Sequence, residues 1–302
     1  MDKDSKTVII IVGPTASGKT NLSLQLADYF KTDIISADSR QCYQELNIGV
    51  AKPSAEELKS IKHYFINSHS IFDEVNAEVF EKYAVQAADE IFINSDVAVM
   101  VGGTGMYIKA FCEGLDEIPK VDSSVRNDII KHYEQYGLEW LQNEVEKKDP
   151  LFWKDAEQQN PQRLMRALEI VTATGISITQ FRSNAKKLRP FKIIKIGIDL
   201  PKQQLHKNID QRVAKMIDDG LIDEVKSLQQ FQHLNALQTV GYKEVFDYLN
   251  EKISLVQSAN DIKSNTKKYA KRQLTWFRKD FLIKWSDNLN PKQIIDSYIN
   301  LP

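Results

Sequence analysis

The sequence predicts an α/β fold, in which a P-loop NTPase-like parallel sheet forms the core and an all-helical insertion domain interrupts it. Three features of the chain predict this fold. Short β-branched runs alternate with helical patterns in the N-terminal third, and a glycine-rich loop follows the first of these runs. Residues 116–190 contain helical patterns without a strand. Strand, helix and strand in short units imply right-handed crossovers, and therefore a parallel sheet.

The individual elements follow from the spacing of apolar residues. A short β-branched run predicts a strand buried on both faces, whereas apolar positions recurring at three and four predict a helix. In chain order, we expect a strand at 7–12, a helix at 21–30, a strand at 33–37, a helix at 76–94 and a strand at 97–101. Helices at 122–136, 138–148 and 161–174 follow, then a strand at 191–200 and helices at 203–231 and 262–284. The P-loop core, with its C-terminal helices, therefore takes residues 1–115 and 191–302, and the insertion takes 116–190.

Length and composition set the broad class. A chain of 302 residues exceeds the typical domain of about 150, so two domains or one large insertion are expected. The 40 basic and 41 acidic residues give a net charge of −1, which argues against a uniformly basic nucleic-acid coat but not against a local basic groove. No apolar run approaches a membrane span, and the start MDKDSK is neither a secretory nor a transit signal. We expect a soluble, cytoplasmic monomer that does not bind a membrane.

Cysteine and histidine usage excludes two further classes of site. Cys42 and Cys112 lie far apart without a CxxC motif, and the five His show no HxxxH or HxH spacing. Neither a disulfide framework nor a cysteine-rich zinc site is therefore expected.

The sequence GPTASGKT at residues 13–20 fits the phosphate-loop pattern GxxxxGK[ST], and it lies between an expected strand and an expected helix. The glycines let the backbone N–H groups point inward, and the helix N-terminus adds partial positive charge. Lys19 can then neutralise phosphate oxygens, while the Thr20 hydroxyl can hold Mg²⁺, the expected cofactor. The predicted diphosphate site comprises Gly13, Pro14, Thr15, Ala16, Ser17, Gly18, Lys19 and Thr20.

The loop alone does not identify the reaction. P-loop kinases usually present a Mg²⁺ carboxylate after a later strand, but the strand at 97–101 ends in VGGTGMY without an acid. Asp38 instead follows the strand at 33–37, on the ligand-binding edge of a parallel sheet. Asp38 is predicted to act as a general base or an indirect Mg²⁺ partner; a capping Asp without chemistry is the alternative.

Motifs spread over nearly the whole chain resemble one family. They are GPTASGKT (13–20), DSRQCY (38–43), IGVAKP (48–53), VGGTGMYIKA (101–110), NPQRLMRALE (160–169), QTVGYKE (238–244) and YAKRQLTWFR (269–278). In this order they resemble the tRNA dimethylallyltransferases, also called tRNA isopentenyltransferases. Many families share a P-loop, whereas the DS…AKP and YAKRQ…W elements are specific. The chain ends without the zinc finger of many eukaryotic relatives, which implies the bacterial type.

The resemblance implies an enzyme that transfers a dimethylallyl group from dimethylallyl diphosphate to N6 of the adenosine 3′ of the anticodon in tRNA, releasing diphosphate. The insertion would grip the anticodon arm, and the P-loop would hold the leaving diphosphate rather than ATP. Asp38 matches the catalytic Asp, Thr104 a position near the reacting amine, and Arg212 a diphosphate contact. This fits the chemistry, because an exocyclic amine is a poor nucleophile and a carboxylate can accept its proton. Lys19 would stabilise charge on the leaving group.

Two basic runs without an acid, 182–195 and 263–279, support RNA binding, although a solvated helix face is the alternative. The resemblance and these runs give the tRNA-binding residues as Asp38, Ser39, Arg40, Gln41, Thr104, Arg126, Gln162, Arg163, Leu164, Met165, Arg166, Lys271 and Arg272. Three other functions stay open: transfer to free AMP or ATP, a P-loop kinase acting on a small metabolite, and a non-enzymatic, NTP-gated RNA-binding module. The helical insertion and the basic runs favour tRNA.

Overall fold

The computed structural model describes residues 6–183, 185–287 and 289–299. The chain forms two compact units, one of residues 1–114 and 188–302 and one of residues 115–187. They are called here the core unit and the helical unit. Each is described by itself.

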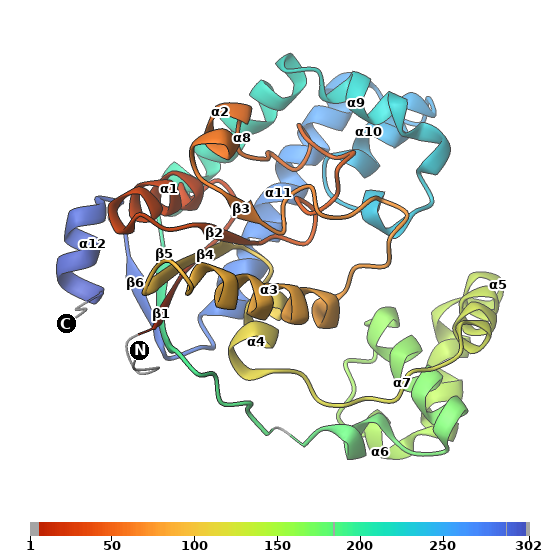
Figure 1. Cartoon of the computed structure of the whole chain (residues 1–302). Helices are drawn as coiled ribbons and strands as arrows, with labels where there is room; N and C mark the ends of the chain where they lie inside the picture. The colour runs from red at the N-terminus through yellow and green to blue at the C-terminus, as the bar shows by residue number, and fades with distance from the viewer. Residues whose placement is uncertain (1–5, 184, 288, 300–302) are drawn as a thin grey trace. The chain divides into compact units, whose positions relative to one another are not determined.

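The core unit contains one six-stranded sheet, and every pair of neighbouring strands is parallel. The strand order is β3-β2-β4-β1-β5-β6 (Figure 1). The strands are β1 (Thr7–Val12), β2 (Ile34–Ala37), β3 (His63–Tyr64), β4 (Val97–Gly102), β5 (Lys192–Ile198) and β6 (Ile283–Ser286). All residues of β1, β2 and β4 are buried, as a sheet covered on both faces requires. The predicted α/β fold with a parallel sheet is confirmed.

Helices cover both faces of this sheet. They are α1 (Lys19–Phe30), α2 (Ala55–Ser60), α3 (Ala77–Ile91), α4 (Gly105–Glu113), α8 (Lys202–Asp218), α9 (Leu221–Ser227), α10 (Tyr242–Leu249), α11 (Leu255–Phe277) and α12 (Pro291–Tyr298). Ile9 and Ile11 pack against α1 and α12, which lie together beside the sheet in Figure 1. Val8 and Ile10 point to the other face and pack in the cluster that contains α3, α4 and α11. Alternate residues of β1 therefore serve two separate apolar cores.

Two predicted helices of the core unit were wrong in part. The helix predicted at 262–284 begins earlier, after the Ser254 N-cap, and ends at Phe277. Residues 283–286 are instead the strand β6, because pairing with β5 outweighs the local pattern of so short a run. The single helix predicted at 203–231 is divided at Gly220, whose φ of 102° separates α8 from α9.

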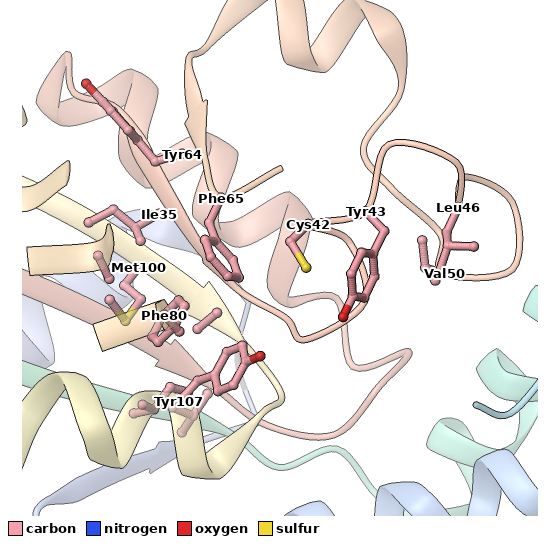
Figure 2. Close-up of a cluster of buried hydrophobic side chains, with 14 of the residues drawn as sticks. Ile35, Cys42, Tyr43, Leu46, Val50, Tyr64, Phe65, Phe80, Met100 and Tyr107 are labelled. Carbon is pink, nitrogen blue, oxygen red and sulfur yellow. The ribbon is translucent and has the colours of Figure 1, made fainter. Parts of the chain in front are cut away.

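An aromatic cluster fixes the segment that follows β2. Phe80 stacks on Tyr107 with ring centroids 4.5 Å apart, and Phe65 meets Phe80 edge-on at 5.0 Å. Figure 2 shows Cys42 and Tyr43 in the same buried cluster. Residues 38–50 are thus anchored to the core through the buried side chains of Cys42, Tyr43, Leu46 and Val50. Burial raises the pKa of the Cys42 thiol to about 12, so this cysteine is unreactive at neutral pH.

The helical unit contains α5 (Ser123–Lys148), α6 (Pro150–Trp153), α7 (Pro161–Thr174) and the short 3-10 helix η2 (Ile178–Phe181). The predicted helix at 161–174 matches α7. The two helices predicted at 122–136 and 138–148 meet at Gly137, where a φ of 75° interrupts α5. Buried Asp149 ties the unit together, because its carboxylate accepts the N–H groups of Phe152 and Ile178 at 2.9 and 3.4 Å. No strand occurs in residues 115–183 or 185–187.

Candidate functional site

The strand order places three loops side by side at the carboxyl edge of the sheet. β4 lies between β1 and β2, and Gly102 pairs with Val12 on one side and Ala37 on the other. The residues that follow these strands are therefore neighbours: the loop that begins at Gly13, the turn at Gly103 and Thr104, and Asp38. Ligands of open parallel sheets bind at this edge, where the strand order reverses.

The predicted phosphate loop lies between β1 and α1. Its backbone enters the left-handed region at two positions. Gly18 has a φ of 86°, which glycine adopts readily, and Ala16 has a φ of 62°, which is uncommon for a residue with a side chain. At Gly13 a Cβ would lie 2.8 Å from the Ile198 carbonyl oxygen, so only glycine fits. Asn208 of α8 also lines the cavity of this loop, and its amide donates to the Ala16 carbonyl at 3.1 Å. The loop thus curls at the N-terminus of α1, as an anion site requires.

Two cations face this loop. Lys19 donates to the Pro14 carbonyl at 2.5 Å, and Arg212 reaches the same cavity from α8. Burial and, to a smaller extent, the Arg212 charge lower the pKa of Lys19 to about 7, against the opposing attraction of Asp38. Burial also lowers the pKa of Arg212, again against the attraction of Asp38. Two desolvated cations beside the loop, against one carboxylate, give this cavity the electrostatics of an anion-binding site.

Asp38 is fixed by one oxygen only. Its Oδ1 accepts the N–H groups of Arg40 and Gln41 at 2.8 and 3.2 Å, which holds the carboxylate in a tight turn. In the described part of the chain, Oδ2 has no hydrogen-bond partner. This is the arrangement of a general base, since the carboxylate is positioned through one oxygen and can accept a proton on the other.

Thr104 is joined to Asp38 through the neighbouring residue. The Ser39 N–H donates to Thr104 Oγ1 at 3.1 Å, and the Thr104 N–H donates to the Ala37 carbonyl at 3.3 Å. Its hydroxyl proton can still be donated to a ligand. Asp38 and Thr104 are therefore linked through the Ser39 backbone at the carboxyl edge of the sheet.

Two adjoining cavities open at this edge. One, of about 440 Å³, is lined by the phosphate loop, and the other, of about 500 Å³, by residues of α8, α10 and α11. Four residues line both: Thr15, Asp38, Arg212 and Tyr269. Burial next to Asp38 raises the pKa of Tyr269 to about 12 and keeps its hydroxyl protonated. Asp38 thus lies at the junction between the cavity of the phosphate loop and a second cavity.

The second cavity has a wall that a single carboxylate holds in place. Glu224 of α9 accepts the N–H groups of Asn47, Ile48 and Gly49 at 3.1, 2.7 and 3.0 Å, and the Tyr242 hydroxyl at 2.5 Å. Gly49 has no room for a Cβ, which would lie 2.5 Å from the Tyr242 ring. Glu224 thus binds the IGVAKP motif through Ile48 and Gly49 and the QTVGYKE motif through Tyr242. The two motifs are therefore parts of one hydrogen-bonded wall.

We expect Glu224→Gln to lower the free energy of unfolding by about 2–3 kcal/mol, because an amide NH₂ would face backbone donors that need an acceptor. Tyr242→Phe removes one donor and leaves the carboxylate, so it should cost about 1 kcal/mol. Urea unfolding with unchanged m-values measures both. A Glu224→Gln variant as stable as the wild type would show that the carboxylate does not hold this wall.

Other predicted RNA-binding residues of the core unit differ in what they contact. Arg40 donates to the carbonyls of Asn235 and Ala236, and the Gln41 amide donates to those of Val50 and Ala51. Both side chains therefore also have structural partners. Lys271 and Arg272 lie exposed on α11, and Arg272 lines the second cavity with its guanidinium 5.6 Å from the Tyr269 ring centroid.

The basic run at 182–195 is only partly a surface feature. Arg189 is paired with Glu81 at 2.7 Å and donates to the Phe111 carbonyl, with both partners largely buried. Lys195 is 8% exposed and contacts Asp280 at 2.6 Å. These two cations are used inside the protein, so they do not support RNA binding.

In the helical unit, predicted RNA contacts line a hollow of about 390 Å³ between α5 and α7. Arg126 and Arg166 converge on Glu169, whose side chain is 3% exposed, at 3.5 and 3.0 Å. Gln162 and Met165 also line the hollow. Arg163 is not among its lining residues and pairs with Glu157 at 2.8 Å. Leu164 is completely buried in the core of the unit, so its side chain offers no surface to a ligand, and this prediction was wrong for the side chain.

The site also holds residues that sequence reasoning missed. Gln273 contacts both the phosphate loop and the Gly103 turn, Asn208 supports the loop, and Glu224 holds the wall of the second cavity. Only Gln273 lies in a motif singled out from the sequence, YAKRQ. The sequence signal for the others is weak, because their partners lie more than 170 residues away.

The residues that could hold Mg²⁺ are few. Among the residues that the structure describes, no cluster of three or more Asp, Glu, His or Cys side chains forms a metal site. Thr20 and Asp38 line the cavity of the phosphate loop. This donor set fits a hydrated Mg²⁺ that takes most of its ligands from a bound diphosphate. In residues 6–183, 185–287 and 289–299, no helix is long and apolar enough to span a membrane.

A phosphate loop beside a strand-end carboxylate on a parallel sheet places the chain in the class of P-loop-type α/β proteins. The model of the IPP transferase family matches residues 41–280, and the chain belongs to this family. It is 47% identical over 293 residues to a tRNA dimethylallyltransferase of Christiangramia forsetii, covering 97% of both chains. It is 41% identical to tRNA dimethylallyltransferase 1 of Bacteroides thetaiotaomicron, covering 98% of this chain and 96% of the relative.

Solved structures agree with this assignment. The tRNA isopentenylpyrophosphate transferase of Bacillus halodurans superimposes with a TM-score of 0.70 at 32% identity, covering 96% of this chain and 94% of that one. A eukaryotic dimethylallyltransferase acting on tRNA gives a TM-score of 0.77 at 25% identity, covering 97% of this chain and 76% of that one. The resemblance described from the motifs is therefore confirmed.

Proposed function

We propose that this protein is a tRNA dimethylallyltransferase, which transfers a dimethylallyl group from dimethylallyl diphosphate to N6 of the adenosine 3′ of the anticodon. The observation that carries the proposal is Asp38 at the junction of the two cavities, with one oxygen fixed and the other without a partner. The phosphate-loop cavity would hold the diphosphate. The acceptor amine would reach Asp38 from the second cavity.

The reaction forms a bond between the acceptor nitrogen and C1 of the allyl group, while the bond from C1 to the diphosphate oxygen breaks. Asp38 takes the proton that the amine loses, and Thr104 can donate a hydrogen bond to the acceptor. Lys19, Arg212 and the loop N–H groups stabilise the charge that collects on the leaving diphosphate. A Mg²⁺ held through Thr20 and the diphosphate would add charge neutralisation.

We further propose that the helical unit binds the anticodon arm. Arg126, Arg166 and Gln162 border one hollow, and Glu169 orders both guanidinium groups: it accepts a hydrogen bond from Arg166 and forms an ion pair with Arg126. Arginines held in this way can present their remaining N–H donors to phosphate or to unpaired bases. In the core unit, Lys271 and Arg272 of α11 would contact RNA beside the second cavity.

Transfer of radiolabel from dimethylallyl diphosphate tests the proposal directly. The purified protein with Mg²⁺ is offered unmodified tRNA, an isolated anticodon stem-loop, AMP and ATP. Label in tRNA and in the stem-loop supports the proposal. Label only in AMP or ATP would keep the chemistry and overturn the RNA assignment, while hydrolysis of ATP without any prenyl transfer would favour a kinase.

A further inference from the structure

Gln273 of α11 joins two loops of the site that are distant in sequence. Its Oε1 accepts the Thr15 N–H at 2.8 Å, and its Nε2 donates to the Gly103 carbonyl at 3.0 Å. Because the Thr15 N–H can only donate and the Gly103 carbonyl can only accept, the orientation of the amide is unambiguous. The side chain is buried at 6% exposure and lines the phosphate-loop cavity.

The packing around this amide is close on the side of the turn. A Cβ at Gly103 would lie 2.1 Å from Gln273 Nε2, and a Cβ at Gly105 would lie 2.2 Å from the Trp276 ring. Gly103 and Gly105 of the GGTG motif therefore let α11 approach the turn. They do not serve a left-handed backbone conformation, since neither glycine has a positive φ.

The contacts continue from the turn to the carboxylate. Thr104 follows Gly103 and accepts the Ser39 N–H, and Ser39 follows Asp38. A continuous series thus runs from the phosphate loop through Gln273 and Thr104 to the carboxylate. In the described residues, Gln273 is the side chain of this series that contacts both loops directly.

We infer that Gln273 is a positioning residue for group transfer: its amide sets the separation between the loop that holds the diphosphate and the turn that carries Thr104. This inference rests on the proposed function. The allylic C1 must lie in line between the leaving oxygen and the attacking nitrogen, and a misplacement of about 1 Å can cost 100-fold in rate. A rigid amide between the two loops provides this alignment without contacting the reacting atoms.

Two variants of nearly the same shape distinguish the hydrogen bond to Thr15 from the hydrogen bond to Gly103. Gln273→Glu keeps an acceptor for Thr15 but places a carboxylate oxygen against the Gly103 carbonyl. We expect its kcat to fall about 100-fold, whereas its KM for dimethylallyl diphosphate and its affinity for inorganic diphosphate should change less, by the repulsion from the added charge in the same cavity. Gln273→Met loses both bonds, so kcat should fall and diphosphate affinity should weaken as well. Gln257→Glu makes the same change at an exposed position of α11 and serves as the control.

A double-mutant cycle covers the case in which a charged variant folds poorly. Gly103→Ala should displace Gln273 and lower kcat to a similar extent. Combining it with Gln273→Ala should cost no more than the larger single loss, because both changes break the same contact. If the double variant instead loses kcat by the product of the two single losses, the inference is overturned. A Gln273→Glu variant with wild-type kcat would overturn it as well. A wild-type protein without transfer activity would overturn the proposed function instead.

Discussion

Asp38→Asn should lower kcat for prenyl transfer about 1000-fold while leaving the affinity for inorganic diphosphate within about threefold of the wild type. The amide oxygen can still accept the N–H groups of Arg40 and Gln41, so the turn is kept. It cannot accept the proton of the amine. Single-turnover transfer of label to a stem-loop measures the chemical step, and calorimetry measures diphosphate binding.

Asp33→Asn is the matched control for this variant. Asp33 precedes β2 and Asp38 follows it, so the two carboxylates lie at opposite ends of the same strand. Asp33→Asn should leave kcat unchanged, because the amino edge of the sheet does not take part in the proposed reaction. An Asp38→Asn variant that retains a tenth of wild-type activity would show that the proton leaves by another route.

Local patterns in the sequence predicted the elements that hold this site. The β-branched run before Gly13 and the short strand before Asp38 depend on neighbouring residues only, and both strands formed as expected. In the sheet these two strands lie on either side of β4, so their carboxyl ends meet at the same edge. The strands β3 and β6 were not predicted, because elements of two and four residues are determined by the neighbour they pair with.

Residues that act across the chain could not be predicted in the same way. Gln273 contacts Thr15 across 258 positions, and Glu224 contacts Ile48 across 176. Nothing near either residue in sequence specifies its partner. The basic run at 182–195 was misleading as a sign of an RNA-binding surface for the same reason. Lys195 is buried in an ion pair with Asp280, which lies 85 positions away in sequence.

Lys19 should make diphosphate binding depend on pH. Its pKa is lowered to about 7 by burial and by Arg212, so in the free protein Lys19 is charged below this pH and neutral above it. An anion binds the charged form better, and above pH 7 binding must therefore take up a proton. We expect metal-free diphosphate affinity to fall by up to tenfold per pH unit between about pH 7 and 9.

Lys19→Met should remove this dependence and lower kcat/KM for transfer about 100-fold or more, because Arg212 alone would remain of the two cations that stabilise the leaving diphosphate. The ionisation of diphosphate itself affects both proteins alike, so the difference between their pH profiles isolates Lys19. The neighbouring charges give two further tests with opposite signs. Arg212→Met removes a charge that repels protonated Lys19, so the pKa of Lys19 should rise and diphosphate affinity should begin to fall at a higher pH. Asp38→Asn removes a charge that attracts protonated Lys19, so affinity should begin to fall at a lower pH. A profile that is the same in wild type and Lys19→Met would contradict the assignment of the titrating group to Lys19.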